Sequence, residues 1–125
     1  MGGTPNLSLI VLYVADIDRS AAFYAALGVT FQREQHGKGP VHYSANINDT
    51  VLELYPASER LPATKVRLGF AIASIDEALE SWHRSGFKAS IEAETAAKNG
   101  ASGANQIQRI VVIDPDRNKV ELHLS

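Results

Sequence analysis

The chain has 125 residues, enough for one compact domain with a hydrophobic core but too few for two independent domains. Hydrophobic residues make up 45% and charged residues 21%, which argues against wholesale disorder. The formal net charge is −2, and the dispersed basic residues give no surface of the kind that binds nucleic acid. The absence of cysteine excludes disulfides, thiolate metal sites and thiol nucleophiles. With no signal-like or membrane-spanning apolar run, we expect a cytoplasmic protein.

The first half of the chain predicts one strand, one helix and three further strands. An alternating apolar segment over 7–14 predicts the first strand, and a helix is expected to begin after the N-cap candidate Asp16 and to stop at Gly28. Three more segments have the period of strands, over 29–35, 41–47 and 50–55. The turn-forming pair Asn48-Asp49 joins the last two strands into a hairpin.

The second half repeats this order. The segment 14–18 resembles 72–76, and Gly28 corresponds to Gly86, both at an offset of 58 residues. The predicted elements are a strand over 65–72, a helix capped by Ser74, and strands over 87–93, 108–113 and 119–124. The segment 51–54 matches 119–122 at an offset of 68, so ten extra residues enter the second half. The segment 96–104, rich in alanine, glycine and serine, is expected to be a mobile loop, and whether it closes as a lid stays open.

The repeat predicts the fold class and the domain organisation. Each half has the order βαβββ, which makes the protein an α+β domain over residues 1–125. Module one covers 7–55 and module two covers 65–125. The segment 56–64 contains two prolines and no apolar period, so it is expected to be the linker between the modules.

The order and spacing of these segments resemble the vicinal oxygen chelate superfamily, which includes glyoxalase I, extradiol dioxygenases, fosfomycin resistance enzymes and bleomycin-binding proteins. The resemblance covers nearly the whole chain and is carried by Tyr13 to Tyr24 with Leu27-Gly28, by Val51 to Leu54, and by Asp114 to Leu122. It implies that the two modules form a curled, U-shaped mixed sheet around a cleft for a small organic molecule. It also implies a homodimer. The four metal-ligand positions of the superfamily, called the family positions below, correspond to Leu9, Glu53, Arg67 and Glu121.

The residues at the family positions argue against a metal. Leu9 has no ligand atom, and the guanidinium of Arg67 stays protonated, offers no lone pair and repels a cation. Only Glu53 and Glu121 remain as ligands, which is a poor set for a transition metal. No cofactor is therefore expected, and a divalent metal is disfavoured. We expect Arg67 to replace the metal by binding both carboxylates.

The period of two decides which other side chains face the cleft with the family positions. Tyr13, Tyr55, His42 and His123 share their face, together with Val11, Val51, Gly69, Ala71, Lys119, Ser44 and Asn46. Tyr13 and Tyr55 either stack on a planar ligand or fill the barrel. His42 and His123 are candidate bases because imidazole titrates near neutral pH, although strand histidines are more often exposed polar residues.

Other polar and aromatic residues have simpler interpretations. Arg109 either binds an anionic group of the ligand or is an edge-strand arginine in solvent. His36 in a turn and His83 on a helix are expected to be surface residues, and Trp82 is expected to lie in the core. Glu53 and Glu121 are either structural partners of Arg67 or a catalytic acid and base.

Three hypotheses of function remain. The first is a metal-free small-molecule binding protein of the bleomycin-resistance type, with ligand contacts from Tyr13, Tyr55, Arg67, His42, Glu53, Glu121 and Arg109. The second is a glyoxalase-like lyase, isomerase or dioxygenase that uses Glu53 and Glu121 with a metal, or His42 or His123 as base without one. The third is an interaction module without a ligand. Fold alone does not choose between these hypotheses, and we favour the binding protein.

Overall fold

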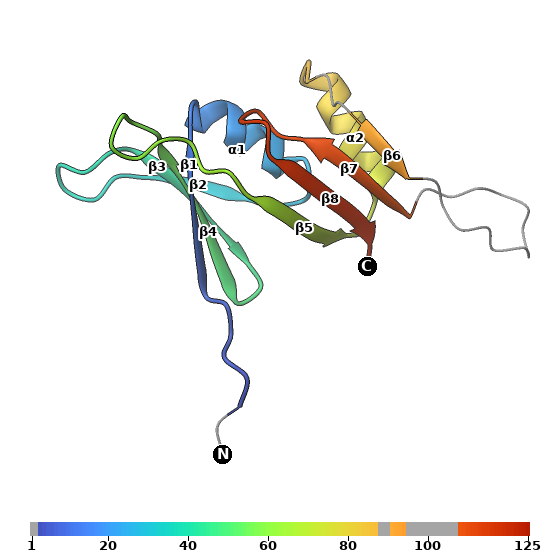
Figure 1. The fold of residues 1–125 in the computed structure, drawn as a ribbon, viewed down its shortest axis with the longest axis horizontal. Helices are drawn as coiled ribbons and strands as arrows, with labels where there is room; N and C mark the ends of the chain where they lie inside the picture. Colours follow the sequence, from blue (N-terminus) through green and yellow to red (C-terminus); the bar gives the residue numbers. More distant parts are fainter. Residues whose placement is uncertain (1–2, 88–90, 95–107) are drawn as a thin grey trace, which may run out of the picture. The chain divides into compact units, whose positions relative to one another are not determined.

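The computed structural model describes residues 3–87, 91–94 and 108–125. The elements follow one another along the chain as β1 (Leu9–Val14), α1 (Ile17–Ala25), β2 (Phe31–Glu34), β3 (His42–Ile47), β4 (Thr50–Pro56), β5 (Arg67–Ile72), α2 (Ile75–Arg84), β6 (Ile91–Glu94), β7 (Arg109–Ile113) and β8 (Lys119–Leu124), as Figure 1 shows. The order βαβββ occurs twice, which confirms the predicted α+β fold class. The segment 96–104, expected to be a loop, lies outside the described residues.

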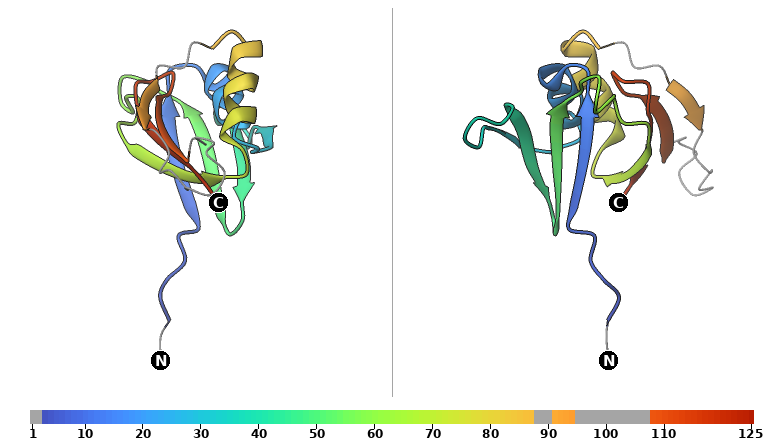
Figure 2. Two further views of the ribbon diagram at one scale, coloured as in Figure 1. Left: turned by 90° about the vertical axis from the view of Figure 1, so that its right-hand side faces the viewer. Right: turned by 60° about the vertical axis from the view of Figure 1, so that its left-hand side comes forward.

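The chain divides into two compact units, each with its own four-stranded sheet. One unit contains Met1–Ala25 and Val29–Thr64, and the other contains Ala26–Gly28 and Lys65–Ser125. The strand orders are β1-β4-β3-β2 and β5-β8-β7-β6. In each sheet the first and last strands of the module pair in parallel and the other neighbours are antiparallel. Figure 2 shows the parallel pair β1 and β4 side by side.

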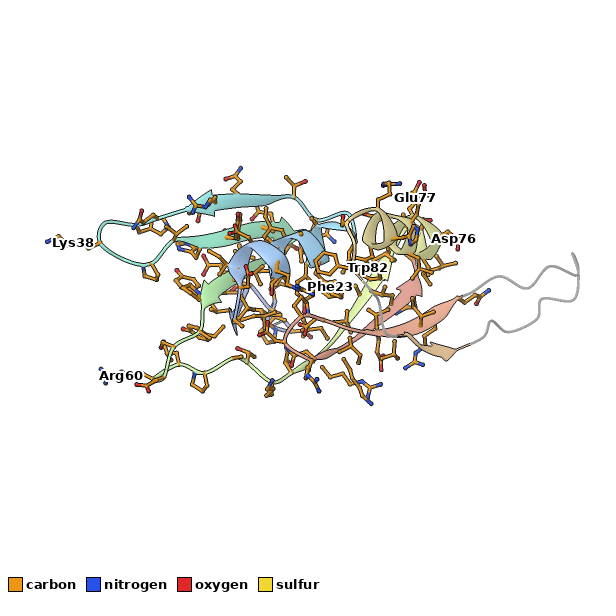
Figure 3. All side chains as sticks on the ribbon, turned by 90° about the horizontal axis from the view of Figure 1, so that it is seen from above. Phe23, Lys38, Arg60, Asp76, Glu77 and Trp82 are labelled. Atoms are coloured by element: carbon orange, nitrogen blue, oxygen red, sulfur yellow. The ribbon has the colours of Figure 1, made fainter. Side chains whose placement is uncertain are left out.

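Both helices begin where the sequence predicts, and α2 ends just before Gly86 as expected, whereas α1 ends at Ala25, before the predicted stop at Gly28. The Asp16 carboxylate accepts a hydrogen bond from the backbone N–H of Arg19 at 3.0 Å, and the Ser74 hydroxyl accepts one from Glu77 at 3.0 Å. Asp76 and Glu77, labelled in Figure 3, add negative charge to the first turn of α2, where the helix dipole favours it. Beyond α2, Gly86 has φ +80°, a left-handed conformation that glycine adopts without strain.

One face of each sheet carries the core. In the first unit the buried side chains of this face are Leu12, Val14, Ala45, Leu52 and Leu54, and α1 contributes Phe23 and Tyr24. In the second unit they are Ile72, Ile110, Val112, Val120 and Leu122, and α2 contributes Ile75, Ala78 and Trp82. Trp82 is 1% exposed, which confirms its predicted place in the core; Figure 3 labels it and Phe23. Each sheet therefore keeps its opposite face for other side chains.

The turn before β8 is held by buried polar side chains. One Asp114 carboxylate oxygen accepts hydrogen bonds from the backbone N–H groups of Asp116 at 2.9 Å and Asn118 at 2.8 Å. The Asn118 side-chain oxygen accepts a further bond at 2.9 Å from the N–H of Val66, the residue before β5. Because Asp114 and Asn118 are each 4% exposed, these bonds fix where β8 begins relative to β5.

Several strand bounds and the position of Arg109 differ from the sequence-based expectations; β1 begins at Leu9 and β5 at Arg67, each two residues later than expected. The second strand is shorter than the expected 29–35, because Val29 and Thr30 precede the first paired residue, Phe31. The interpretation of Arg109 as an edge-strand residue is wrong, because β7 pairs with both β8 and β6. The sequence around Arg109 gave no sign that β6 pairs with the outer edge of β7. Among the helices of the described residues, none is both long and apolar enough to span a bilayer.

Candidate functional site

In the first unit, a polar and aromatic face lies on the side of the sheet opposite to Leu52 and Leu54. The register pairs Ser44 with Glu53 and His42 with Glu34. Side chains at alternate positions of a strand share a face, so His42 and Glu34 lie on the face of Glu53. Tyr55, two residues after Glu53 on β4, lies opposite Tyr13 on β1. The register therefore brings together the four candidates that the sequence placed in the first module.

His42 is the centre of this face. It is 1% exposed, which contradicts the common pattern of exposed strand histidines. Its Nδ1 lies 3.2 Å from the carbonyl oxygen of Pro40, and its ring stacks on Tyr55 with centroids 4.2 Å apart and planes 7° apart. Tyr55 in turn contacts Tyr13, with centroids 6.1 Å apart and a tilt of 50°. The imidazole is thus fixed by a hydrogen bond in its plane and by an aromatic ring on its face.

Carboxylates surround the other ring nitrogen of His42. Glu34 Oε1 lies 3.4 Å from His42 Nε2 and 3.6 Å from His36 Nε2, while Glu53 Oε2 lies 4.0 Å from His42 Nε2. We call Glu34, His36, His42, Glu53 and Tyr55 the His42 cluster. It combines groups that donate, accept and transfer protons within a few ångströms of one another.

Burial and charge act together on Tyr55. Burial raises the pKa of the Tyr55 hydroxyl above its ordinary value, and the negative charge of Glu53 raises it further. The hydroxyl is therefore a neutral hydrogen-bond donor over the physiological pH range. Beside an aromatic surface, such a donor suits the recognition of a planar ligand with a polar substituent.

In the second unit, two arginines bind one carboxylate. Glu121 Oε1 accepts a hydrogen bond at 2.9 Å from Arg67 Nε, a second one from Arg67 Nη2, and one at 2.9 Å from Arg109 Nη2. The register explains the meeting, because Glu121 lies opposite Gly69 on β5 and Val111 on β7, two residues from each arginine on the same face. We call Arg67, Arg109 and Glu121 the Glu121 cluster.

The arginines change the acidity of Glu121. The hydrogen bonds from Arg67 lower the pKa of its carboxyl group, and the charge of Arg109 lowers it further. The predicted pairing of Arg67 with Glu121 is therefore present within the second unit. The predicted pairing of Arg67 with Glu53 joins the two units and stays a prediction.

The family positions do not fit a metal ion. Leu9 has an apolar side chain that is 51% exposed, and Arg67 presents N–H groups that are already donated to Glu121. Glu121 itself is bound by two cations on one oxygen. A metal at these positions would have to displace both guanidinium groups and would gain few ligands in return.

The structure also places the remaining candidates and adds two residues. His123 is exposed on β8, in register with Arg109, and His83 is exposed on α2. The two added residues are Glu34 and His36, which the sequence did not single out as site residues. The side chain of His36 is 75% exposed, as expected for a surface residue. The sequence signal was a Glu-x-His pair on one side of a turn and a histidine on the other. The missing information was the register that pairs Glu34 with His42.

Several solved structures have this fold, and their matches cover almost the whole chain. An antibiotic binding protein, TnmS3 from Streptomyces sp. CB03234, is 20% identical with a TM-score of 0.66, and the match covers 99% of this chain and 98% of that one. The oxidase ChaP-H2 is 17% identical with a TM-score of 0.67, covering 98% and 95% of the two chains. A glyoxalase/bleomycin resistance protein from Streptomyces sp. CB03234 is 18% identical with a TM-score of 0.60, covering 94% and 99%. At such identities the likeness concerns the fold.

A family model gives the assignment that these structures alone do not. The comparison with curated proteins gives no match. The model described as Glyoxalase/Bleomycin resistance protein/Dioxygenase superfamily matches residues 6–122, which contain both helices and the strands β1 to β7 of the described residues and the first part of β8. The repeated βαβββ order agrees with this match. The chain therefore belongs to the glyoxalase/bleomycin resistance protein/dioxygenase superfamily.

Proposed function

We propose that the chain is a small-molecule binding protein of the glyoxalase/bleomycin-resistance type that holds its ligand without a metal at the family positions. The observation that carries the proposal is the stack of Tyr55 on His42 beside Tyr13, next to the carboxylate of Glu53. Aromatic surface with a few fixed polar groups is typical of sites for organic ligands. TnmS3, which has the same fold, is an antibiotic binding protein, and this supports the same class of ligand.

The charges favour particular ligand groups. In the first unit, the Tyr55 hydroxyl can donate a hydrogen bond to a ligand and the Glu53 carboxylate can accept one from it. A planar compound with a hydrogen-bond acceptor and a hydrogen-bond donor therefore fits this face. In the second unit, Arg67 and Arg109 remain 55% and 44% exposed while bound to Glu121. The half-exposed guanidinium of Arg67 suits the recognition of an anionic group of the ligand. We further propose a cytoplasmic homodimer that binds neither nucleic acid nor membrane, because the net charge is −2 and the basic residues are dispersed.

A screen of planar aromatic compounds tests the binding proposal. Compounds that raise the melting temperature would be titrated by calorimetry, and the recovered ligand would be checked for chemical change. Tyr55→Leu should weaken binding between about twofold and tenfold, the range of one lost aromatic contact. Tyr43→Phe is the matched control, because Tyr43 lies on the opposite face of the same sheet, where it donates to Asp18. Equal loss in both variants, or the absence of any stabilising compound, would contradict the proposal.

An enzyme is the second candidate, and the His42 cluster supports it. An imidazole between two carboxylates is a suitable general base, with Glu34 at 3.4 Å and Glu53 at 4.0 Å from Nε2. A lyase, isomerase or dioxygenase reaction that uses Glu53 and Glu121 belongs to this candidate. It predicts a consumed rather than a recovered ligand, and a reaction that stops in Glu53→Gln or His42→Gln while the ligand still binds.

A further inference from the structure

We propose that Glu34, His36 and His42 form a binding site for a divalent transition-metal ion, with zinc as the reference ion. The three residues lie on the hairpin of β2 and β3, and their ligand atoms all lie within 4.8 Å of one another. None of them occupies a family position. The inference shares His42 with the proposed ligand-binding face, but its test measures zinc rather than an organic ligand, so the two proposals can fail separately.

The distances in this group fit a metal as common centre. Ligands at about 2.1 Å from a tetrahedral zinc ion are roughly 3.4 Å apart. Glu34 Oε1 lies 3.4 Å from His42 Nε2 and 3.6 Å from His36 Nε2. Two of the three ligand pairs therefore already have the separation that a shared ion requires. The third pair joins the two imidazoles, whose ring centroids lie 5.1 Å apart, and the His36 side chain is 75% exposed.

His42 presents its free lone pair to this centre. The Pro40 carbonyl oxygen only accepts hydrogen bonds, so its 3.2 Å contact places the proton of neutral His42 on Nδ1. The lone pair is then on Nε2, the atom nearest to Glu34. Tyr55 does not occupy this lone pair, because its ring is stacked at 7° to the imidazole and its oxygen lies off the ring plane, 3.5 Å from Nε2. A backbone carbonyl that orients a histidine in this way is a common second-shell arrangement of metal sites.

The turn holds His36 next to the end of β2. The N–H of Gly39 donates to the carbonyl oxygen of His36 at 3.0 Å, and the Gln35 side chain donates to the carbonyl oxygen of Gly39 at 2.9 Å. Gly37 has φ +59°, which lets the chain reverse directly after His36. The closed turn thus keeps the imidazole of His36 on the same side as the carboxylate of Glu34.

The nearby cations lie elsewhere. Arg33 is on the opposite face of β2, in register with Tyr43, whose hydroxyl it influences. Lys38 is at the tip of the hairpin and extends away from the sheet, as Figure 3 shows. In contrast to the Glu121 cluster, this group of the first unit therefore offers carboxylate and imidazole ligands without a guanidinium bound to them.

The ligand types decide the class of metal. Two imidazoles and one carboxylate suit zinc, nickel or ferrous iron, whereas magnesium and calcium prefer sites made of oxygen alone. Three protein ligands leave at least one coordination position for water or for a small molecule. The adjacent Glu53 is near enough to influence that position, since its Oε2 lies 4.0 Å from His42 Nε2.

Zinc binding to untagged, chelator-treated protein tests the site. Calorimetry should show one zinc ion per chain, and cobalt(II) should give the visible absorption of a low-symmetry site with nitrogen ligands. His36→Ala should weaken zinc binding at least tenfold, because loss of even a second-shell residue has an effect of that size. His83→Ala, an exposed histidine on α2, is the matched control and should bind zinc as the natural chain does.

Two further variants separate this site from the alternatives. Glu34→Gln should weaken zinc binding as His36→Ala does, and it leaves the buried His42 in place. Glu53→Gln should retain zinc, whereas a metal at the family positions would be lost in this variant. The proposal is overturned if the natural chain binds no zinc, if His36→Ala binds as tightly as His83→Ala, or if Glu53→Gln alone abolishes binding. Each of these results is independent of whether an organic ligand is found.

Discussion

Replacing Asp114 by alanine should destabilise the second unit strongly. The carboxylate accepts two backbone N–H bonds through Oδ1 and a bond at 3.2 Å from the Asn118 side chain through Oδ2. Leaving a buried N–H group without an acceptor costs about 1–3 kcal/mol, so two of them give roughly 2–6 kcal/mol. This is a large part of the about 5–15 kcal/mol by which natural proteins are stable. The change should also release Asn118, which positions Val66 and hence Arg67 beside Glu121.

Urea unfolding followed by circular dichroism measures this effect. Asp114→Asn keeps one side-chain oxygen for the two N–H groups and loses the bond from Asn118, so it should cost about 1–2 kcal/mol. Asp49→Ala is the matched control in the corresponding hairpin of the first unit, where the side chain is exposed and the change should be within about 0.5 kcal/mol. If Asp114→Ala cost no more than Asp49→Ala, the assignment of the turn as a structural anchor would be refuted.

Three further predictions concern charge and backbone strain. The pKa of Glu121 is lowered in the folded chain, so its contribution to stability is complete above about pH 4.3 and is lost as the pH falls through the lower folded pKa. In Glu121→Gln, the free energy of unfolding measured in urea should therefore fall less steeply as the pH is lowered. The hydrogen bond to Asp18 is the main cause that raises the pKa of Tyr43, so Asp18→Asn should bring the pKa of one tyrosine back toward about 10 in an ultraviolet titration. An unchanged titration curve would contradict this. Arg117 has φ +71°, so Arg117→Gly should raise the free energy of unfolding by up to about 1 kcal/mol, and a loss of stability would argue against strain at this turn.

The fold was predictable because its signals are local and occur twice. The N-cap residues Asp16 and Ser74 and the alternation around Leu52 and Val120 each decide a structure within a few residues. Repetition of these signals, at an offset of 58 residues for the caps and 68 for the last strands, excluded most other arrangements. The strand order needed the resemblance as well, because parallel pairing of β1 with β4 leaves no mark in the sequence of either strand.

The site was predictable only in part because it depends on register and loop length. Alternation placed Tyr55 and Glu53 on one face, since both belong to the same strand. The meeting of Glu34 with His42 depends on how the seven residues 35–41 form a turn, and a shift by one residue would move Glu34 to the other face. The burial of His42 follows from its neighbours Tyr55 and Pro40, which pattern alone does not bring together.

The parallel pairing within each unit also bears on how the chain tolerates changes of length. Val11 pairs with Glu53 and Gly69 pairs with Glu121, so the connections enclosed by these pairs differ by the ten residues inferred from the repeat. The entropy of closing a flexible loop grows only with the logarithm of its length, so this difference costs about 0.2 kcal/mol. A length difference of this size between the two connections is therefore nearly neutral thermodynamically, and the two parallel pairs can keep the same register in spite of it.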